Sequence, residues 1–133
     1  MSDARFIQDA DIVRDSFDWG QAGWVSRPEL TGSRAFCIMD VLIKPGQGHA
    51  FHRHPDQEEI IWVIEGRVEQ WLEQDKQELG PGEAVYIPKD VVHASFALGD
   101  TDAKISVILS PTAGEDGYSV VDVFEEEPWA SLR

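Results

Sequence analysis

Apolar residues in this chain gather in short runs, and nearly every run ends at a glycine or a proline. The runs cover residues 35–43, 60–64, 83–87, 94–98 and 104–109. Their short lengths and their content of β-branched and aromatic residues predict strands. Residues 35–43 are nearly continuously apolar, so we expect that strand to be buried on both faces, and residues 60–64 likewise predict a buried strand.

The stretches between these runs predict turns and further short strands. Residues 67–79 predict a hairpin with a polar turn at 73–76, and residues 118–124 predict one more strand. No stretch has a convincing helical period beyond a single turn expected at Pro128. Many short strands separated by glycine and proline predict an all-β sandwich or barrel.

A chain of 133 residues fits one domain. We expect residues 1–34 to form an N-terminal arm that packs aromatic side chains, such as Trp19 and Trp24, on the barrel or on a partner subunit. Residues 35–124 would form the β-barrel itself. Residues 125–133 would form a short C-terminal tail.

Acidic residues dominate the composition, with 25 Asp and Glu against 11 Lys and Arg and a formal net charge of −14. This charge disfavours nucleic acids and anionic membrane surfaces as partners, because both are negatively charged. No apolar run approaches the roughly 20 residues of a membrane helix, and the first residues lack the apolar segment of a signal peptide. We therefore expect an intracellular, cytoplasmic protein.

Cys37 is the only cysteine in the sequence. A single cysteine excludes an intrachain disulfide and a cysteine-based zinc site. Cys37 lies within an apolar run, so we expect a packed thiol rather than a nucleophile.

The residues with the clearest chemistry lie between Gly46 and Gly66. His52 and His54 stand two apart, so on an extended strand both imidazoles would point to the same side. Glu59 opens the next apolar run after a turn. Two imidazoles and a carboxylate on neighbouring strands are what a divalent metal ion needs from a β scaffold.

Two motifs with fixed spacing make the chain resemble the cupin superfamily. The first, G-x5-H-x-H-x3,4-E-x6-G, is matched without a break by Gly46, His52, His54, Glu59 and Gly66. The second, G-x5-P-x-G-x2-H-x3-N, is matched by Gly82, Pro88 and His93, with Asp90 in place of its second glycine and Ala97 in place of its asparagine. Asp is among the few residues that tolerate positive φ, so we expect the turn at Asp90 to survive.

The resemblance implies a double-stranded β-helix, the cupin jelly-roll barrel, as a small single domain. It also implies one divalent transition metal inside the barrel, held by His52, His54, Glu59 and His93. Fe, Mn, Ni, Co, Cu and Zn all suit such a donor set, and affinity alone does not choose among them.

Neighbouring residues compete with these candidates or surround them. Glu58 also fits the spacing that the family allows, but the six residues before Gly66 select Glu59, and Glu58 has the opposite strand parity. His49 has the opposite parity to His52 and His54, so we expect it outside the ligand shell. The same alternation predicts a small, mostly apolar pocket lined by Ile61, Val63, Ser95 and Ala97.

Three imidazoles and one carboxylate would leave a divalent ion with open positions and one net positive charge. Such a site would attract a small molecule that chelates through oxygen: an enolate, a carboxylate, a keto or hydroxy acid, or a sugar derivative. We therefore predict a small metalloenzyme, either a dioxygenase-like oxidoreductase or an isomerase or lyase. Glu59 would double as a ligand and a proton acceptor.

The sequence is also compatible with two other functions. As a non-catalytic module, the protein would hold a small ligand in the barrel as a sensor or carrier. As a structural site, the metal would stabilise a homodimer with Trp19, Trp24 and the C-terminal segment at its interface. The resemblance implies a homodimer in all three cases, because cupins usually pair their sheets.

Overall fold

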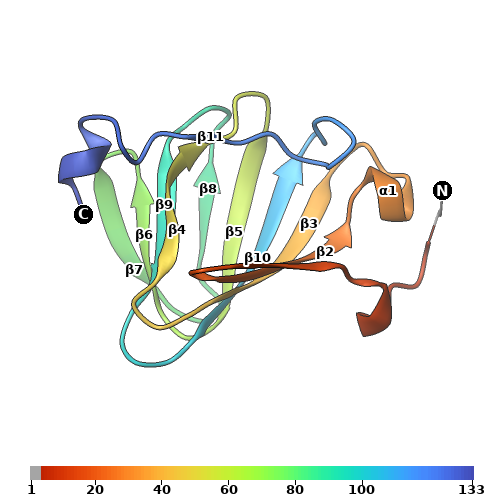
Figure 1. The fold of residues 1–133 in the computed structure, drawn as a ribbon, viewed down its shortest axis with the longest axis horizontal. Coiled ribbons are helices and arrows are strands. Elements are labelled where there is room, and N and C mark those ends of the chain that lie inside the picture. The colour runs from red at the N-terminus through yellow and green to blue at the C-terminus, as the bar shows by residue number, and fades with distance from the viewer. Residues whose placement is uncertain (1–3) are drawn as a thin grey trace.

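Two antiparallel sheets pack face to face in the computed structural model, which describes residues 4–133 (Figure 1). In sheet order, the six-stranded sheet consists of β1 (Arg14–Phe17), β2 (Gly20–Ser26), β3 (Cys37–Ile43), β10 (Ala103–Ser110), β5 (Glu58–Glu65) and β8 (Ala84–Ile87). The five-stranded sheet consists of β11 (Val121–Asp122), β4 (Gly48–Arg53), β9 (His93–Ala97), β6 (Val68–Leu72) and β7 (Asp75–Leu79). This arrangement confirms the predicted all-β double-stranded β-helix.

The central strands of the six-stranded sheet bury only one face. Along β3, β5 and β10, buried side chains alternate with partly or fully exposed ones. Ile60, Trp62 and Ile64 point outward and are 36%, 48% and 46% exposed. The expectation that residues 35–43 are buried on both faces is therefore wrong. The strand predicted at residues 60–64 is buried on one face only, because nothing in residues 4–133 covers the outer face of β5.

The N-terminal segment forms part of the six-stranded sheet. β2 pairs antiparallel with β3, and β1 pairs antiparallel with β2, so the segment expected as an arm extends the sheet at its edge. Trp24 is 3% exposed and belongs to the core between the sheets. The first three residues of the expected arm lie outside the described part of the chain.

Two short helical elements accompany these strands. A 3-10 turn, η1, spans Asp9–Asp11, and one helical turn, α1, spans Pro28–Thr31. α1 was not predicted, although Pro28 stands at its first position and Gly32 ends it with φ +80°. A proline start and a glycine stop are typical of helices, but four residues are too few to show a helical period.

The C-terminal segment covers the outer face of the five-stranded sheet. The predicted strand at 118–124 is reduced to the two residues of β11, and the chain then ends in the 3-10 turn η2 (Trp129–Ser131) directly after Pro128, where a turn was expected. The ring of Trp129 lies 5.8 Å from that of Phe51, within a second apolar cluster on β4, β6 and β9. The five-stranded sheet is therefore covered on both faces, whereas the outer face of β5 in the other sheet is exposed.

Two local expectations are confirmed. Asp90 adopts φ +66°, and its carboxylate accepts a hydrogen bond from Arg53 Nη1 at 2.6 Å. Cys37 is fully buried, and burial raises the pKa of its thiol to about 11. Within residues 4–133 the structure contains no helix of the length and apolarity that crossing a membrane requires.

Candidate metal centre

Four side chains on or directly next to three strands converge inside the barrel. His52 and His93 face each other across β4 and β9, His54 follows directly after β4, and Glu59 lies near the start of β5. One ring nitrogen from each of the three histidines lies within 4.8 Å of the other two. Glu59 Oε1 is 2.9 Å from His93 Nε2 and 3.4 Å from His54 Nε2. All four side chains are buried.

Each of the three histidines uses Nδ1 to bond a backbone carbonyl. The Nδ1 atoms of His52, His54 and His93 lie 2.7, 2.8 and 3.0 Å from the carbonyl oxygens of Ala50, Ser119 and Val91. A carbonyl oxygen only accepts, so Nδ1 must carry the proton in each ring. In the neutral rings Nε2 is then left with a free lone pair, which is the form that ligates a metal.

Two buried atoms of the four converging residues lack a hydrogen-bond partner among residues 4–133. They are Glu59 Oε1 and His93 Nε2, which lie 2.9 Å apart without forming a hydrogen bond. Buried polar atoms without a partner are rare in proteins. A cation bound between three imidazole nitrogens and a carboxylate would satisfy them, so the residues present fit a divalent transition metal.

Burial and mutual proximity set the charges of the site. Burial lowers the pKa of His52 well below its ordinary value, and the charge of His49 adds to this effect. Burial also lowers the pKa of His54, although the charge of Glu59 opposes it.

Glu59 and His93 form the coupled pair of the site. Burial, the largest single effect, would raise the pKa of Glu59, but the contact with His93 and the charges of His93, His54 and His49 together outweigh burial and lower it. Burial, the largest single effect, would lower the pKa of His93, but the charge of Glu59 and the other polar contacts of the ring together outweigh burial and raise it. At neutral pH Glu59 is therefore an anion, and His52 and His54 are neutral, as cation binding requires.

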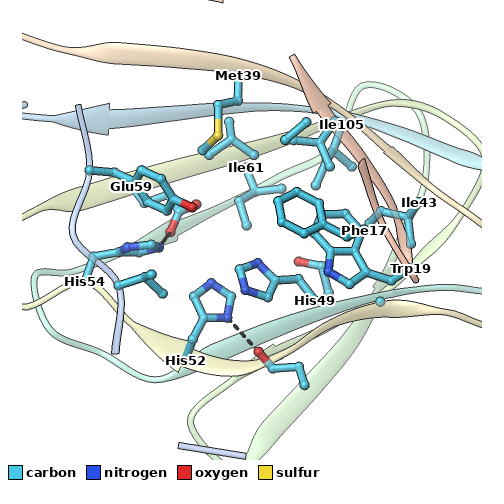
Figure 2. Close-up of a pocket in the computed structure, with 18 of the residues that line it drawn as sticks. Phe17, Trp19, Met39, Ile43, His49, His52, His54, Glu59, Ile61 and Ile105 are labelled. Atoms are coloured by element: carbon cyan, nitrogen blue, oxygen red, sulfur yellow. Dashed lines mark hydrogen bonds and ion pairs between the residues drawn. The ribbon is translucent and has the colours of Figure 1, made fainter. Parts of the chain in front are cut away.

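A cavity of about 430 Å³ adjoins this site, and its wall is mostly apolar (Figure 2). His52, His54 and Glu59 lie in its wall, together with apolar side chains that include Trp19, Trp24, Met39, Ile61, Ile105 and Tyr118. Of the four residues expected to line the pocket, Ile61 and Ser95 do so. Val63 and Ala97 pack in the main core instead, two residues further along β5 and β9, where about 7 Å of strand separates them from the cavity wall.

His49 lies inside this cavity, which strand parity did not predict. Between His49 and His52, β4 has one residue more than β9 has between Ser95 and His93, so β4 contains a β-bulge. The bulge cancels the difference in parity, and the His49 ring stacks on the His52 ring with a centroid distance of 3.7 Å. His49 is not among the three histidines whose nitrogens converge. No sequence signal marks this bulge.

The hairpin of β1 and β2 adds two more rings to the same stack. Trp19 stacks on His49 at 5.3 Å, and Phe17 stacks on Trp19 at 5.0 Å, with interplanar angles of 9° and 3°. We call Phe17, Trp19 and His49 the aromatic column. Figure 2 shows these rings side by side next to His52, across the cavity from Met39 and Ile61.

Glu58 points the other way, as its parity predicted. It is exposed on the outer face of β5 and accepts a hydrogen bond from the Tyr86 hydroxyl at 3.2 Å. Of the two adjacent glutamates, only Glu59 therefore reaches the histidines.

Comparison with known proteins places this fold and site in a family. A family model described as a cupin domain matches residues 39–109, a range that contains all four converging side chains. The chain is 28% identical over 127 residues to Protein SchB of Streptomyces halstedii, covering 96% of this chain and 92% of that protein. It is 33% identical over 95 residues to Polyketide synthase CurC of Streptomyces cyaneus, covering 71% of this chain and 62% of that protein.

A solved structure shows the same fold over nearly the whole length. The polyketide cyclase RemF from Streptomyces resistomycificus matches with a TM-score of 0.75 and 18% identity, covering 97% of this chain and 98% of that one. The family match spans more than half of this chain, and the jelly-roll fold agrees with it. This protein therefore belongs to the cupin family.

Proposed function

We propose that this protein is a metal-dependent cupin enzyme of the isomerase or lyase type. Its substrate would be a planar, oxygen-chelating, largely apolar small molecule of the polyketide class. The observation that carries this proposal is the joining of four metal-type donors to an apolar cavity of about 430 Å³ with a stacked aromatic wall. The names of CurC and RemF, which refer to polyketide chemistry, support the substrate class.

The four converging residues would hold the metal. His52, His54 and His93 would bind it through Nε2 and Glu59 through a carboxylate oxygen, and Fe, Mn, Ni, Co, Cu and Zn all suit this set. When bound, the metal would supply a Lewis acid that polarises a carbonyl or enolate oxygen of the substrate.

The remaining residues of the cavity would orient the substrate and exclude water. The aromatic column offers a flat surface on which a conjugated ring can stack, and Met39 and Ile61 line the cavity with apolar surface. Glu59 is a buried anion at the edge of this cavity. It would accept a proton from a carbon next to the polarised carbonyl, which is the first step of a cyclisation or isomerisation.

Mass spectrometry of reaction mixtures tests this proposal. Purified protein with a measured metal content would be incubated with hydroxylated quinones and with short poly-β-ketones. The expected product has either the mass of the substrate or that mass less one water, as an isomerase or a cyclising lyase requires. A product that gains two oxygen atoms would instead assign the protein to the dioxygenases, and absence of binding by every planar compound would contradict the substrate class.

A non-catalytic carrier is the second candidate, and the apolar wall favours it. Few polar side chains apart from His52, His54 and Glu59 face the cavity. One of them, Asp15, already accepts a hydrogen bond from Trp24 Nε1 at 3.2 Å. As a carrier, the protein would show a ligand-induced rise in melting temperature with no chemical change in the ligand.

We also propose that two copies of the chain pair through the outer face of the six-stranded sheet. Ile60, Trp62, Ile64 and Tyr86 lie together there on the paired strands β5 and β8, each at least 36% exposed. By contrast, Trp24 is buried in its own chain, and the C-terminal segment covers its own sheet. The expected interface through Trp19, Trp24 and the C-terminal segment would therefore lack the ring of Trp24.

Charge on the same face favours a second copy as the partner. Glu58 lies at one end of the apolar patch and Lys104 at the other, because β5 and β10 pair Ser110 with Glu58 and Lys104 with Glu65. Two copies stacked with antiparallel β5 strands would bring Lys104 of each copy towards Glu58 of the other. The centre of the contact would be apolar. Each end would bring Glu58 of one copy to Lys104 of the other, whose Nζ also lies 3.8 Å from Glu65 Oε2 of its own chain.

A further inference from the structure

A buried glutamine outside the converging four holds the loop that faces them. Gln57 is 1% exposed, and both polar atoms of its carboxamide form hydrogen bonds with one segment of the chain. Its Nε2 donates to the carbonyl oxygens of Pro111 at 2.8 Å and Gly117 at 3.0 Å, and its Oε1 accepts from the backbone N–H of Ser119 at 3.0 Å. We call residues 111–119, which connect β10 to the segment before β11, the bridging loop.

The bridging loop carries the hydrogen-bond acceptor of one histidine of the site. The carbonyl oxygen of Ser119 lies 2.8 Å from His54 Nδ1, while the N–H of the same residue is held by Gln57. The preceding residue, Tyr118, lines the cavity and packs its ring 5.9 Å from that of His54. A continuous hydrogen-bonded path therefore runs from Gln57 through Ser119 to His54.

His54 differs from His52 and His93 in how far away its acceptor lies along the chain. The carbonyl groups that bond His52 and His93 belong to residues only two positions earlier, so local backbone geometry positions them. The acceptor of His54 lies 65 residues away and depends on the placement of the bridging loop. Gly114 and Gly117 of this loop both have positive φ, so the loop is not part of a regular ladder.

We propose that Gln57 is a positioning residue that sets the tautomer and orientation of His54 through Ser119. The functional consequence rests on the proposed metal site: with Gln57 in place, His54 keeps its proton on Nδ1 and presents Nε2 to the ion. Without Gln57, the Ser119 carbonyl is no longer held against His54, so the other tautomer becomes populated. Residues that orient a metal ligand in this way typically change metal affinity by about 10-fold to 100-fold when replaced.

The matched variants are Gln57→Leu and Gln70→Leu. Both replace a buried glutamine on or near a strand by a leucine that fills similar space. Gln70 accepts a hydrogen bond from the Ser95 hydroxyl at 2.7 Å and donates to the carbonyl of Trp71 at 3.0 Å, and neither partner contacts His54 through a hydrogen bond. Gln70→Leu therefore controls for the general loss of buried hydrogen bonds.

Long-range ¹H–¹⁵N spectra of histidine side chains in the metal-free protein give the decisive measurement. For the wild-type protein and Gln70→Leu, we expect His52 and His54 to carry the proton on Nδ1 alone. For Gln57→Leu, we expect a mixture of tautomers at His54 only. Affinity for Zn²⁺, measured by competition with a chelator, should fall by about 10-fold in Gln57→Leu relative to Gln70→Leu.

An unchanged His54 in folded Gln57→Leu, or an equal change in all three histidines, would overturn the proposal. If Gln57→Leu does not fold, Gln57→Asn gives the same test, because its shorter side chain cannot reach all three partners. The tautomer is read without metal, so it tests Gln57 even if the wild-type protein binds no Zn²⁺. A wild-type protein that binds no Zn²⁺ would contradict the proposed metal site. The spectra would still decide whether Gln57 positions His54.

Discussion

A histidine ligates a metal only through a ring nitrogen that carries no proton, and backbone carbonyls decide which nitrogen that is. In this protein the carbonyl oxygens of Ala50, Ser119 and Val91 each bond an Nδ1 atom and so leave three Nε2 atoms free. The orphaned Oε1 of Glu59 completes the donor set. At the scale of single residues, the site is thus arranged for a cation before any ion binds.

Loss of one imidazole should sharply weaken metal binding. Replacing His52 or His93 by alanine should lower metal affinity by about 100-fold or more, because the lost ligand is replaced at best by water. His49→Phe keeps an aromatic ring against His52 and should leave metal content unchanged. Elemental analysis and chelator competition measure both effects, and an equal loss in all three variants would place His49 among the ligands.

His49 should make the fold sensitive to acid. Burial, with the charges of His93 and His54, lowers the pKa of His49 to about 4, whereas the unfolded chain has a histidine pKa of about 6.5. Below about pH 6.5, His49 therefore binds a proton in the unfolded state but not in the folded state. The free energy of unfolding consequently falls as pH falls towards 4.

The variant His49→Phe isolates this contribution. Urea unfolding of the metal-free protein between pH 7.5 and 4.5 should show a smaller loss of stability in His49→Phe than in the wild-type protein. The loss does not vanish, because burial also lowers the pKa of His52 and His54. Parallel pH profiles for the two proteins would show that His49 is protonated in the fold as easily as in the unfolded chain.

At the scale of elements, the β1–β2 hairpin builds one wall of the cavity. It brings Phe17 and Trp19 against His49, which the bulge in β4 has turned inward. In Figure 1 this hairpin reaches from the edge of the six-stranded sheet towards β4. The N-terminal segment therefore contributes directly to the cavity and does more than pack on the outside of the barrel.

Removal of the Trp19 ring should weaken ligand binding without affecting the metal. Trp19→Ala should lower the affinity for a hydroxylated anthraquinone by about 10-fold, since about 1.4 kcal/mol of stacking would be lost. Trp62→Ala removes the same side chain from the outer face of β5 and serves as the control. Calorimetric titration of both variants at equal metal content measures the difference. Equal affinities would show that the aromatic column does not contact the ligand.

At the scale of the whole molecule, the two sheets differ in what covers their outer faces. The C-terminal segment packs Val123 and Trp129 onto the five-stranded sheet, and no described segment does so on the outer face of β5. A chain with a formal charge of −14 repels its own copies except where the surface is uncharged or complementary. The patch of Ile60, Trp62, Ile64 and Tyr86 is such a surface.

A charge placed in the middle of this patch should prevent association. We expect the wild-type protein to scatter light as a dimer and Trp62→Glu to scatter as a monomer with unchanged metal content, because the glutamate would be buried without a partner at the interface. Trp19→Ala should remain dimeric. A wild-type monomer at micromolar concentration would contradict the proposed interface.

The pattern of short strands in the sequence predicted an all-β fold, and the resemblance of two spaced motifs to the cupin superfamily implied the jelly-roll barrel and the convergence of His52, His54, Glu59 and His93. Strand alternation and fixed motif spacing act over a few residues, so they can be read without coordinates. The role of these four residues as metal ligands stays a prediction.

Tertiary structure alone decided the remaining features. The inward position of His49 depends on a bulge in the pairing of β4 with β9, and the exposure of Trp62 depends on which sheet the C-terminal segment covers. The tautomer of His54 depends on a carbonyl 65 residues away. Each of these features arises from contacts between segments that are distant along the chain. The local alternation of apolar and polar residues does not predict such contacts.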